Sequence, residues 1–135
     1  MNHQQDSESD TSFASLGLAP TVLEALADVG YERPSPIQSM IIPHVLAGRD
    51  VIGQAQTGTG KTAAFALPII QMLYQQRSAH KTKAVRALVL APTRELAIQV
   101  AESFGTYGKH TGVRHVAIFG GVSQYQQTQA LRRGV

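Results

Sequence analysis

The chain has 135 residues, of which 43% are hydrophobic, and this suits one modest α/β or α+β core but leaves no room for two full domains. It contains no cysteine, which excludes disulfides and thiolate metal sites and disfavours secreted scaffolds and zinc modules. The net charge of +3 combines an acidic N-terminus with a body of 12 basic and six acidic residues, a balance that allows contact with a polyanion but does not require it.

The first 12 residues form a polar segment with three acidic side chains, which we expect to be a disordered tail. The segment has neither a positive n-region nor an apolar h-region, so a signal peptide is not expected. The longest apolar run, residues 63–70, has only eight residues and contains Pro68, which is too short for a membrane span. These features predict a cytoplasmic protein without membrane contact.

Two helices are predicted in the first part of the ordered region, which is expected to begin near Phe13. Apolar residues recur at helical spacing over residues 16–29, with Pro20 suited to a first helical turn, and indicate a short helix that ends at Gly30. A second helix is predicted up to Leu46. Its boundaries are marked by Ser35 as the N-cap, Pro36 as the first helical residue and Gly48 as the stop.

Three further helices alternate with three short apolar runs. The helices are predicted over residues 61 to about 76, 94 to about 107 and 123–133. Pro68 is expected to bend the first of them, and a capping-box spacing opens the last, at Ser123 and Gln126. The apolar runs, predicted to be strands, are residues 50–54, 87–91 and 116–119. Strand followed by helix, three times over, predicts an α/β fold in which a parallel sheet has helices on both faces.

Residues 55–62, AQTGTGKT, join the first predicted strand to a helix and are typical of a phosphate-binding loop, although Ala55 replaces the first glycine of the G-x-x-x-x-G-K-[ST] pattern. Gly58 and Gly60 would let the backbone turn tightly and offer N–H groups to an anion. Lys61 would reach the terminal phosphates, and the Thr62 hydroxyl would ligate Mg²⁺, which makes these two the candidate catalytic residues. The alternative is a glycine-rich turn with a solvated lysine, which the combined spacing and context disfavour.

Four segments resemble the motifs of one family, the DEAD-box RNA helicases. AQTGTGKT resembles motif I, whose first loop position is commonly alanine in that family, and residues 30–38, GYERPSPIQ, resemble the Q motif with Phe13 as its isolated upstream aromatic. Residues 92–97, PTRELA, resemble motif Ia, and residues 120–121 resemble the GG motif. The four stand in the family's order and cover nearly all of residues 13–135. The chain is therefore identified as the N-terminal part of a first RecA-like helicase domain, most similar to the bacterial RhlE-like group.

The resemblance implies ATP and Mg²⁺ as cofactors. Gln38 would hydrogen-bond the adenine edge, since an amide both donates and accepts, and Tyr31 would stack on the ring. Each residue also has a structural interpretation: Gln38 as part of a capping box with Ser35, Tyr31 as a packed turn aromatic, and Phe13 as a packing anchor or a hydrophobic staple. The implied nucleotide contacts are Phe13, Tyr31, Arg33, Gln38, Ala55, Gln56, Thr57, Gly58, Thr59, Gly60, Lys61 and Thr62.

RNA is the partner that the resemblance implies, through Pro92, Thr93, Arg94, Gly120 and Gly121. A helix N-terminus and an arginine suit phosphates, and a glycine pair allows close approach of the backbone. The alternatives are a surface charge at Arg94, paired with Glu95 or another acid, and a simple strand-ending turn at the glycines. The basic run of residues 77–86, with Lys81 and Lys83, is interpreted as a solvated connector. The five histidines lack metal-ligand spacing and are interpreted as non-ligands: His3, His44, His80, His110 and His115.

Hydrolysis of a bound nucleotide also needs carboxylates at strand ends, and no apolar run in this sequence ends in Asp-Glu. In the family, the Asp-Glu-Ala-Asp and Ser-Ala-Thr motifs and a second RecA-like domain lie downstream. We therefore expect the N-terminal part of an ATP-dependent RNA helicase, a partial RecA-like domain that is incomplete at its C-terminus, marginally stable and inactive alone. The alternative is a stand-alone nucleotide- or RNA-binding module. A P-loop kinase or GTPase is disfavoured, since an adenine-reading Gln38 and the PTRELA segment are not expected in such a protein.

Overall fold

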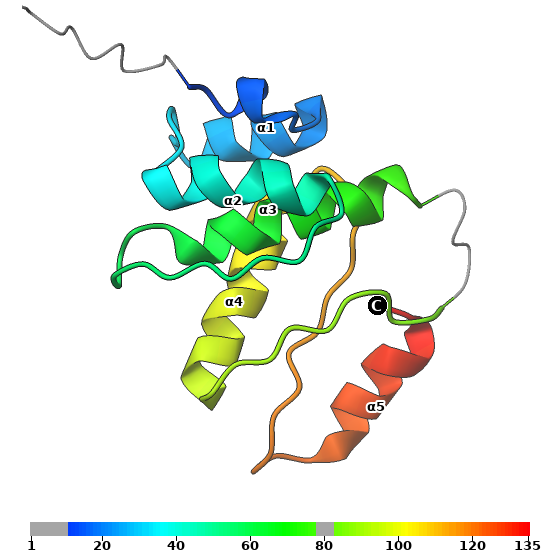
Figure 1. The fold of residues 1–135 in the computed structure, drawn as a ribbon. Coiled ribbons are helices and arrows are strands. Elements are labelled where there is room, and N and C mark those ends of the chain that lie inside the picture. The colour runs from blue at the N-terminus through cyan, green and yellow to red at the C-terminus, as the bar shows by residue number, and fades with distance from the viewer. Residues whose placement is uncertain (1–10, 78–82) are drawn as a thin grey trace, which may run out of the picture.

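The computed structural model describes residues 11–77 and 83–135, and its ordered elements there are helices joined by long segments (Figure 1). Most of the expected disordered tail lies outside the described residues, as do His3, His80 and Lys81. The helices, in chain order, are the 3₁₀-helix η1 (Ala14–Leu16), α1 (Pro20–Asp28), α2 (Pro36–Leu46), α3 (Lys61–Gln75), α4 (Arg94–Tyr107) and α5 (Gln124–Arg133).

The N-terminal helix α1 is preceded by a separate short turn of 3₁₀-helix. Residues 14–16 form only the short η1, and Gly17, with a φ of +87°, ends it in the left-handed region that suits glycine. Pro20 then opens α1 at a position where no backbone N–H is needed. The linker between the two is held by the buried Gln71 of α3, whose amide accepts from the N–H of Ala19 and donates to the carbonyl of Gly17. Pro20 in the first helical turn is therefore confirmed, while Leu16, the first residue of the apolar pattern, belongs to η1.

The other helix boundaries are close to those predicted. Ser35 is the N-cap of α2 and Pro36 its first residue, while Gly48 follows the helix with a φ of +76°. Pro68 lies inside α3 and is buried, but the bend expected there stays a prediction. At α5 the hydroxyl of Ser123 accepts from the N–H of Tyr125, so the expected pairing with Gln126 is not the one formed.

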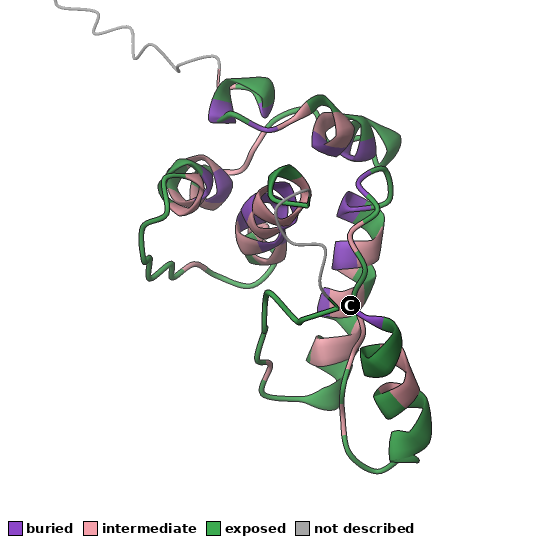
Figure 2. Cartoon of the chain, turned by 90° about the vertical axis from the view of Figure 1, so that its right-hand side faces the viewer, coloured by how far each residue is buried: buried purple, intermediate pink, exposed green. Residues whose placement is uncertain are grey.

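The core lies between the helices, with α3 packed between α2 and α4 and contacted by α1 as well (Figure 1). The inward face of α3 carries alanines beside larger side chains, so its neighbours can approach closely, and Leu67 and Ile70 are fully buried there. Burial of such a side chain contributes about 1.5–3 kcal/mol. Figure 2 shows buried residues on the facing sides of α1 to α4, whereas α5 has none. The packing of α1 to α4 therefore fixes the ends of the loops that join these helices.

The three predicted strands are present as non-helical segments, but no strand is assigned in residues 11–77 or 83–135. A β-ladder needs a paired neighbour at about 4.8 Å, and these segments have none among the described residues. Their apolar side chains are consequently exposed: Ile52 fully, Leu88 to 79% and Leu90 to 85%. Residues 50–54 and 87–90 are exposed throughout, whereas only Ile118 is exposed among residues 116–119.

No helix within the described ranges is both long enough and apolar enough to cross a membrane.

Candidate functional site

The loop of residues 55–62 leads directly into α3, and its two internal glycines have the backbone that the sequence predicts. Gly58 and Gly60 have φ values of +81° and +87°, which side chains disfavour. A Cβ atom at Gly58 would meet nothing within 4 Å, whereas one at Gly60 would lie 2.3 Å from the Nε2 of Gln38. Gly60 is also the N-cap of α3, where the first N–H groups have no partner within the helix. The loop can therefore offer backbone donors to an anion.

Lys61 and Thr59 fold this loop back on itself. The Nζ of Lys61 donates to the carbonyl of Ala55 at 2.7 Å, and the Oγ1 of Thr59 donates to the carbonyl of Gln56 at 2.6 Å. Lys61 is exposed and is the first residue of α3. An anion that enters the loop would compete with the Ala55 carbonyl for Lys61. Thr62, the next residue, is partly buried.

Gln38 joins the start of α2 to this loop. Its side chain is only 5% exposed, and its Oε1 accepts from the N–H of Ser35 at 2.9 Å while its Nε2 donates to the carbonyl of Gly60 at 3.2 Å. The capping-box interpretation is thus confirmed. The hydroxyl oxygen of Ser35 faces the box but is buried without a hydrogen bond of standard geometry. One polar group beside the loop is therefore left to be satisfied by something else.

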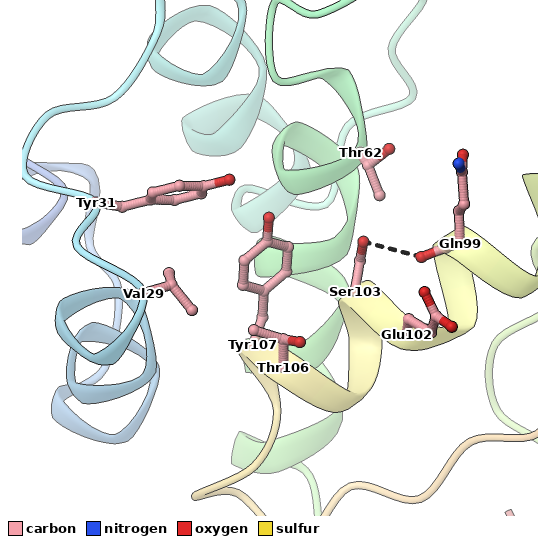
Figure 3. Close-up of a pocket in the computed structure, with 8 residues that line it drawn as sticks. All are labelled: Val29, Tyr31, Thr62, Gln99, Glu102, Ser103, Thr106 and Tyr107. Atoms are coloured by element: carbon pink, nitrogen blue, oxygen red, sulfur yellow. Dashed lines mark hydrogen bonds between the residues drawn. The ribbon is translucent and has the colours of Figure 1, made fainter.

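Tyr31 lies at a cavity of about 440 Å³ that also includes Thr62 (Figure 3). The cavity is bounded by the end of α1, by α3 and by α4, and the ring of Tyr31 contacts that of Tyr107, with centroids 6.2 Å apart. Burial, and then the hydrogen bond with Tyr31, raise the pKa of the Tyr107 hydroxyl. Glu102 places a carboxylate in the α4 wall, which disfavours a phosphate there.

The remaining residues expected at a nucleotide lie at different depths. Phe13 is 4% exposed and belongs to the hydrophobic core, which is the place of a packing anchor. Arg33, Gln56 and Thr57 are exposed, while Ala55 is partly buried. The structure therefore brings Gln38, Gly60 and Lys61 together and leaves the ring of Phe13 inside the helical layer.

A second group of predicted residues lies at the start of α4. Thr93 is the N-cap, and its hydroxyl accepts from the N–H of Leu96 at 3.2 Å. The guanidinium of Arg94 stacks over the ring of Phe119, 4.6 Å from its centroid. Arg94 has no ion pair within the described residues, so the alternative of a surface charge paired with Glu95 is not observed. Because Phe119 directly precedes Gly120, this contact brings Arg94 close to the glycine pair.

Gln127 of α5 is a residue that the sequence analysis missed. Its Nε2 donates to the carbonyl of Phe119 at 2.9 Å, and its Oε1 accepts from the N–H of Phe119 at 3.2 Å. Gly121, two residues on, has a φ of +79°. A cavity of about 370 Å³ is lined by this turn and by α5. Only the helical phase of α5 could have indicated that Gln127, among several glutamines there, faces the turn.

An ionic cluster joins the C-terminal ends of α1 and α4. Asp28 accepts from Lys109 at 2.6 Å and from His110 at 2.8 Å, and these hydrogen bonds, first that of Lys109, hold the pKa of Asp28 below its usual value. His110 is a surface histidine, as predicted, with an acid partner that the sequence did not reveal. No cluster suited to a metal ion is found within residues 11–77 and 83–135.

The sequence matches the model of one protein family, described as DEAD/DEAH box helicase, over residues 35–135. It is 56% identical over 128 residues to the ATP-dependent RNA helicase DeaD of Escherichia coli strain K12, which covers 94% of this chain and 20% of that protein. It is 48% identical over 123 residues to the DEAD-box ATP-dependent RNA helicase CshA of Bacillus cereus, covering 91% and 22%. The chain thus spans about a fifth of the length of these relatives.

Two solved structures are similar in fold. The RNA helicase Prp28 of Chaetomium thermophilum bound to ADP has a TM-score of 0.80 and 41% identity, covering 91% of this chain and 30% of that one. A DEAD box protein of Methanococcus jannaschii has a TM-score of 0.75 and 36% identity, covering 89% and 32%. The predicted fold class, part of a RecA-like P-loop domain, is thereby confirmed. The narrower RhlE-like assignment stays a prediction, since the relatives above carry other names.

Proposed function

Because the chain belongs to the DEAD/DEAH box helicase family, we propose that it supplies the ATP-binding loop, the adenine-reading segment and part of the RNA track of an ATP-dependent RNA helicase. The observation that carries the proposal is the hydrogen bond from Gln38 to Gly60, which fixes an adenine-reading candidate beside a loop with free backbone donors. The protein would work in the cytoplasm on RNA. A stand-alone binding module is not favoured, since the similar proteins are named helicases.

The residues of the loop fit a nucleoside triphosphate with Mg²⁺. Gly58 has open space around it, the N–H groups at the start of α3 lack intrahelical partners, and the buried Ser35 hydroxyl lacks a hydrogen bond of standard geometry. Lys61 would exchange the Ala55 carbonyl for a phosphate oxygen, and Thr62 would hold the metal ion. When bound, the metal would neutralise charge that develops on the phosphates.

The base would be read on the side of α2. Gln38 can offer a donor and an acceptor to an adenine edge only if it releases Gly60 or Ser35, because both ends of its amide are engaged. The exposed face of Tyr31, which is 45% exposed, would stack on the base. The remaining contacts of the proposal are Phe13 behind the site, Arg33 and the rest of residues 55–62.

RNA would lie along the edge formed by the start of α4 and the glycine pair. The Thr93 cap engages the N–H of Leu96, which leaves the N–H groups of Arg94 and Glu95 for a phosphate, and the Arg94 side chain adds a planar set of donors. Pro92 would set the entry of the chain into the helix, and Gly120 and Gly121, both exposed, would let a sugar–phosphate chain approach the backbone.

The test uses the protein expressed from its complete gene. We expect it to separate a short labelled RNA duplex with ATP but not with GTP, and its release of phosphate from ATP to increase when RNA is added. Lys61→Ala should abolish both activities, whereas Lys109→Ala, which removes the same charge away from the loop, should not. Strand separation that is independent of ATP, or that survives Lys61→Ala, would contradict the proposal.

A further inference from the structure

The side-chain amide of Gln127 forms with the backbone of Phe119 the two hydrogen bonds that a neighbouring β-strand could supply. It accepts from the N–H and donates to the carbonyl of the same residue, at 3.2 and 2.9 Å, so both backbone groups of Phe119 are paired. No strand is assigned in the described ranges to provide these bonds. A polar backbone left unpaired at a partly buried residue would be costly. Gln127 therefore fixes the position of Phe119 relative to α5.

Two features of the proposed RNA track depend on where Phe119 lies. Its ring supports the guanidinium of Arg94 at 4.6 Å, and its carbonyl begins the peptide that leads into Gly120. The left-handed Gly121 turns the chain immediately afterwards. A shift of Phe119 would thus move both the platform under Arg94 and the turn. The pairing of Gln127 joins these groups from three separate segments into one unit.

We propose that Gln127 is a positioning residue for RNA binding, which holds the Phe119–Gly121 turn and, through the Phe119 ring, the guanidinium of Arg94. The inference rests on the proposed RNA role of Arg94 and the glycine pair. Gln127 need not touch RNA itself, because both of its polar atoms are engaged with Phe119. Methionine has a similar length but can form neither bond, so Gln127→Met removes the pairing while keeping the bulk of the side chain.

The experiment measures the affinity of the complete protein for a short fluorescent single-stranded RNA, with a non-hydrolysable ATP analogue present. Gln127→Met should weaken binding by about fivefold or more, the loss expected when hydrogen bonds that order a contact are removed. Gln126→Met is the matched control, because this neighbour on α5 is exposed. Arg94→Ala tests the RNA track directly, and the affinity for fluorescent ADP reports on the other site.

The double variant Arg94→Ala/Gln127→Met separates positioning from general loss of structure. If Gln127 acts through Arg94, the double variant should lose less affinity than the product of the two single losses. The affinity for ADP and the melting temperature should stay close to those of Gln126→Met. RNA affinity of Gln127→Met equal to that of Gln126→Met would overturn the inference, as would a parallel loss of RNA and ADP binding. Wild-type RNA affinity in Arg94→Ala would instead overturn the proposed RNA track and this inference with it.

Discussion

The side chain of Gln38 donates to the carbonyl of Gly60, 22 residues away in sequence, at 3.2 Å and thereby links the N-termini of α2 and α3. Its other end is fixed by the N–H of Ser35, so the amide has little freedom to rotate. The position of the loop before α3 therefore depends on the start of α2. A ligand that binds to one of these two elements should therefore affect the position of the other.

Replacement of Gln38 by alanine should destabilise the chain. The change leaves the N–H of Ser35 and the carbonyl of Gly60 without this partner, and a cost of about 1–3 kcal/mol in the free energy of unfolding is expected. Urea denaturation followed by far-UV circular dichroism measures the effect. Gln75→Ala, at the exposed end of α3, is the control and should change little. Equal stability of the two variants would mean that the amide does not hold the loop.

The glycines of the loop should respond differently to alanine. Gly60→Ala combines a left-handed backbone with a Cβ at 2.3 Å from Gln38, so it should cost more than the roughly 1–2 kcal/mol of backbone strain alone. Gly30 has a similar φ of +75° but open space, which makes Gly30→Ala the matched control for strain without collision. Thermal denaturation should rank Gly60→Ala well below Gly30→Ala. The reverse order would show that the contact with Gln38 is not tight.

The ionic cluster at Asp28 predicts a dependence of stability on pH. Hydrogen bonds from Lys109 and His110 lower the pKa of Asp28, so its contribution is fully present above the ordinary value of 3.8 and is lost as pH falls through the lowered pKa. Asp28→Asn should therefore melt below the wild type at about pH 6, and the difference should shrink in acid below 3.8 and in high salt. Asp50→Asn serves as the control, because Asp50 has no ion pair among the described residues. A difference that persists in acid would assign the effect to packing.

The hydroxyl of Tyr107 should ionise at a higher pH than that of an ordinary tyrosine. Burial, together with the hydrogen bond to Tyr31, raises its pKa, so stability from this group is present below the usual value of 10.0 and is lost as pH rises above it. In an absorbance titration of the phenolates, Tyr107→Phe should remove the component that titrates last. Tyr125→Phe, which replaces an exposed tyrosine, is the control and should leave this late component in place. Loss of the same component in both variants would contradict the assignment.

Local signals in the sequence were sufficient for most helices and for the loop. The Ser35–Pro36 start of α2 and the Lys61 start of α3 follow from capping and glycine patterns that act within a few residues. The separation of η1 from α1 has a non-local cause, since Gln71, more than 50 residues away, holds the Gly17–Ala19 linker. The residues close to position 17 in the sequence do not reveal this contact with Gln71.

The contacts between segments were the part that the sequence could not supply. The stacking of Arg94 on Phe119 and the pairing of Gln127 with Phe119 depend on how α4 and α5 pack around one turn. The predicted strands are not assigned among the described residues for a related reason. A strand is stabilised by hydrogen bonds to neighbouring strands, whereas a helix forms its hydrogen bonds within itself. The exposed Ile52, Leu88 and Leu90 show the apolar pattern that predicted strands, without the paired neighbours that would make it a sheet.

The most direct test of the nucleotide site is a titration of the purified 135-residue chain with a fluorescent ADP, beside its Lys61→Ala variant. The account predicts saturable binding that Lys61→Ala weakens by about tenfold or more and that adenine but not guanine nucleotides displace. Binding that is unchanged in Lys61→Ala, or displaced equally by GDP, would contradict the claim that residues 55–62 and Gln38 form an adenine nucleotide site.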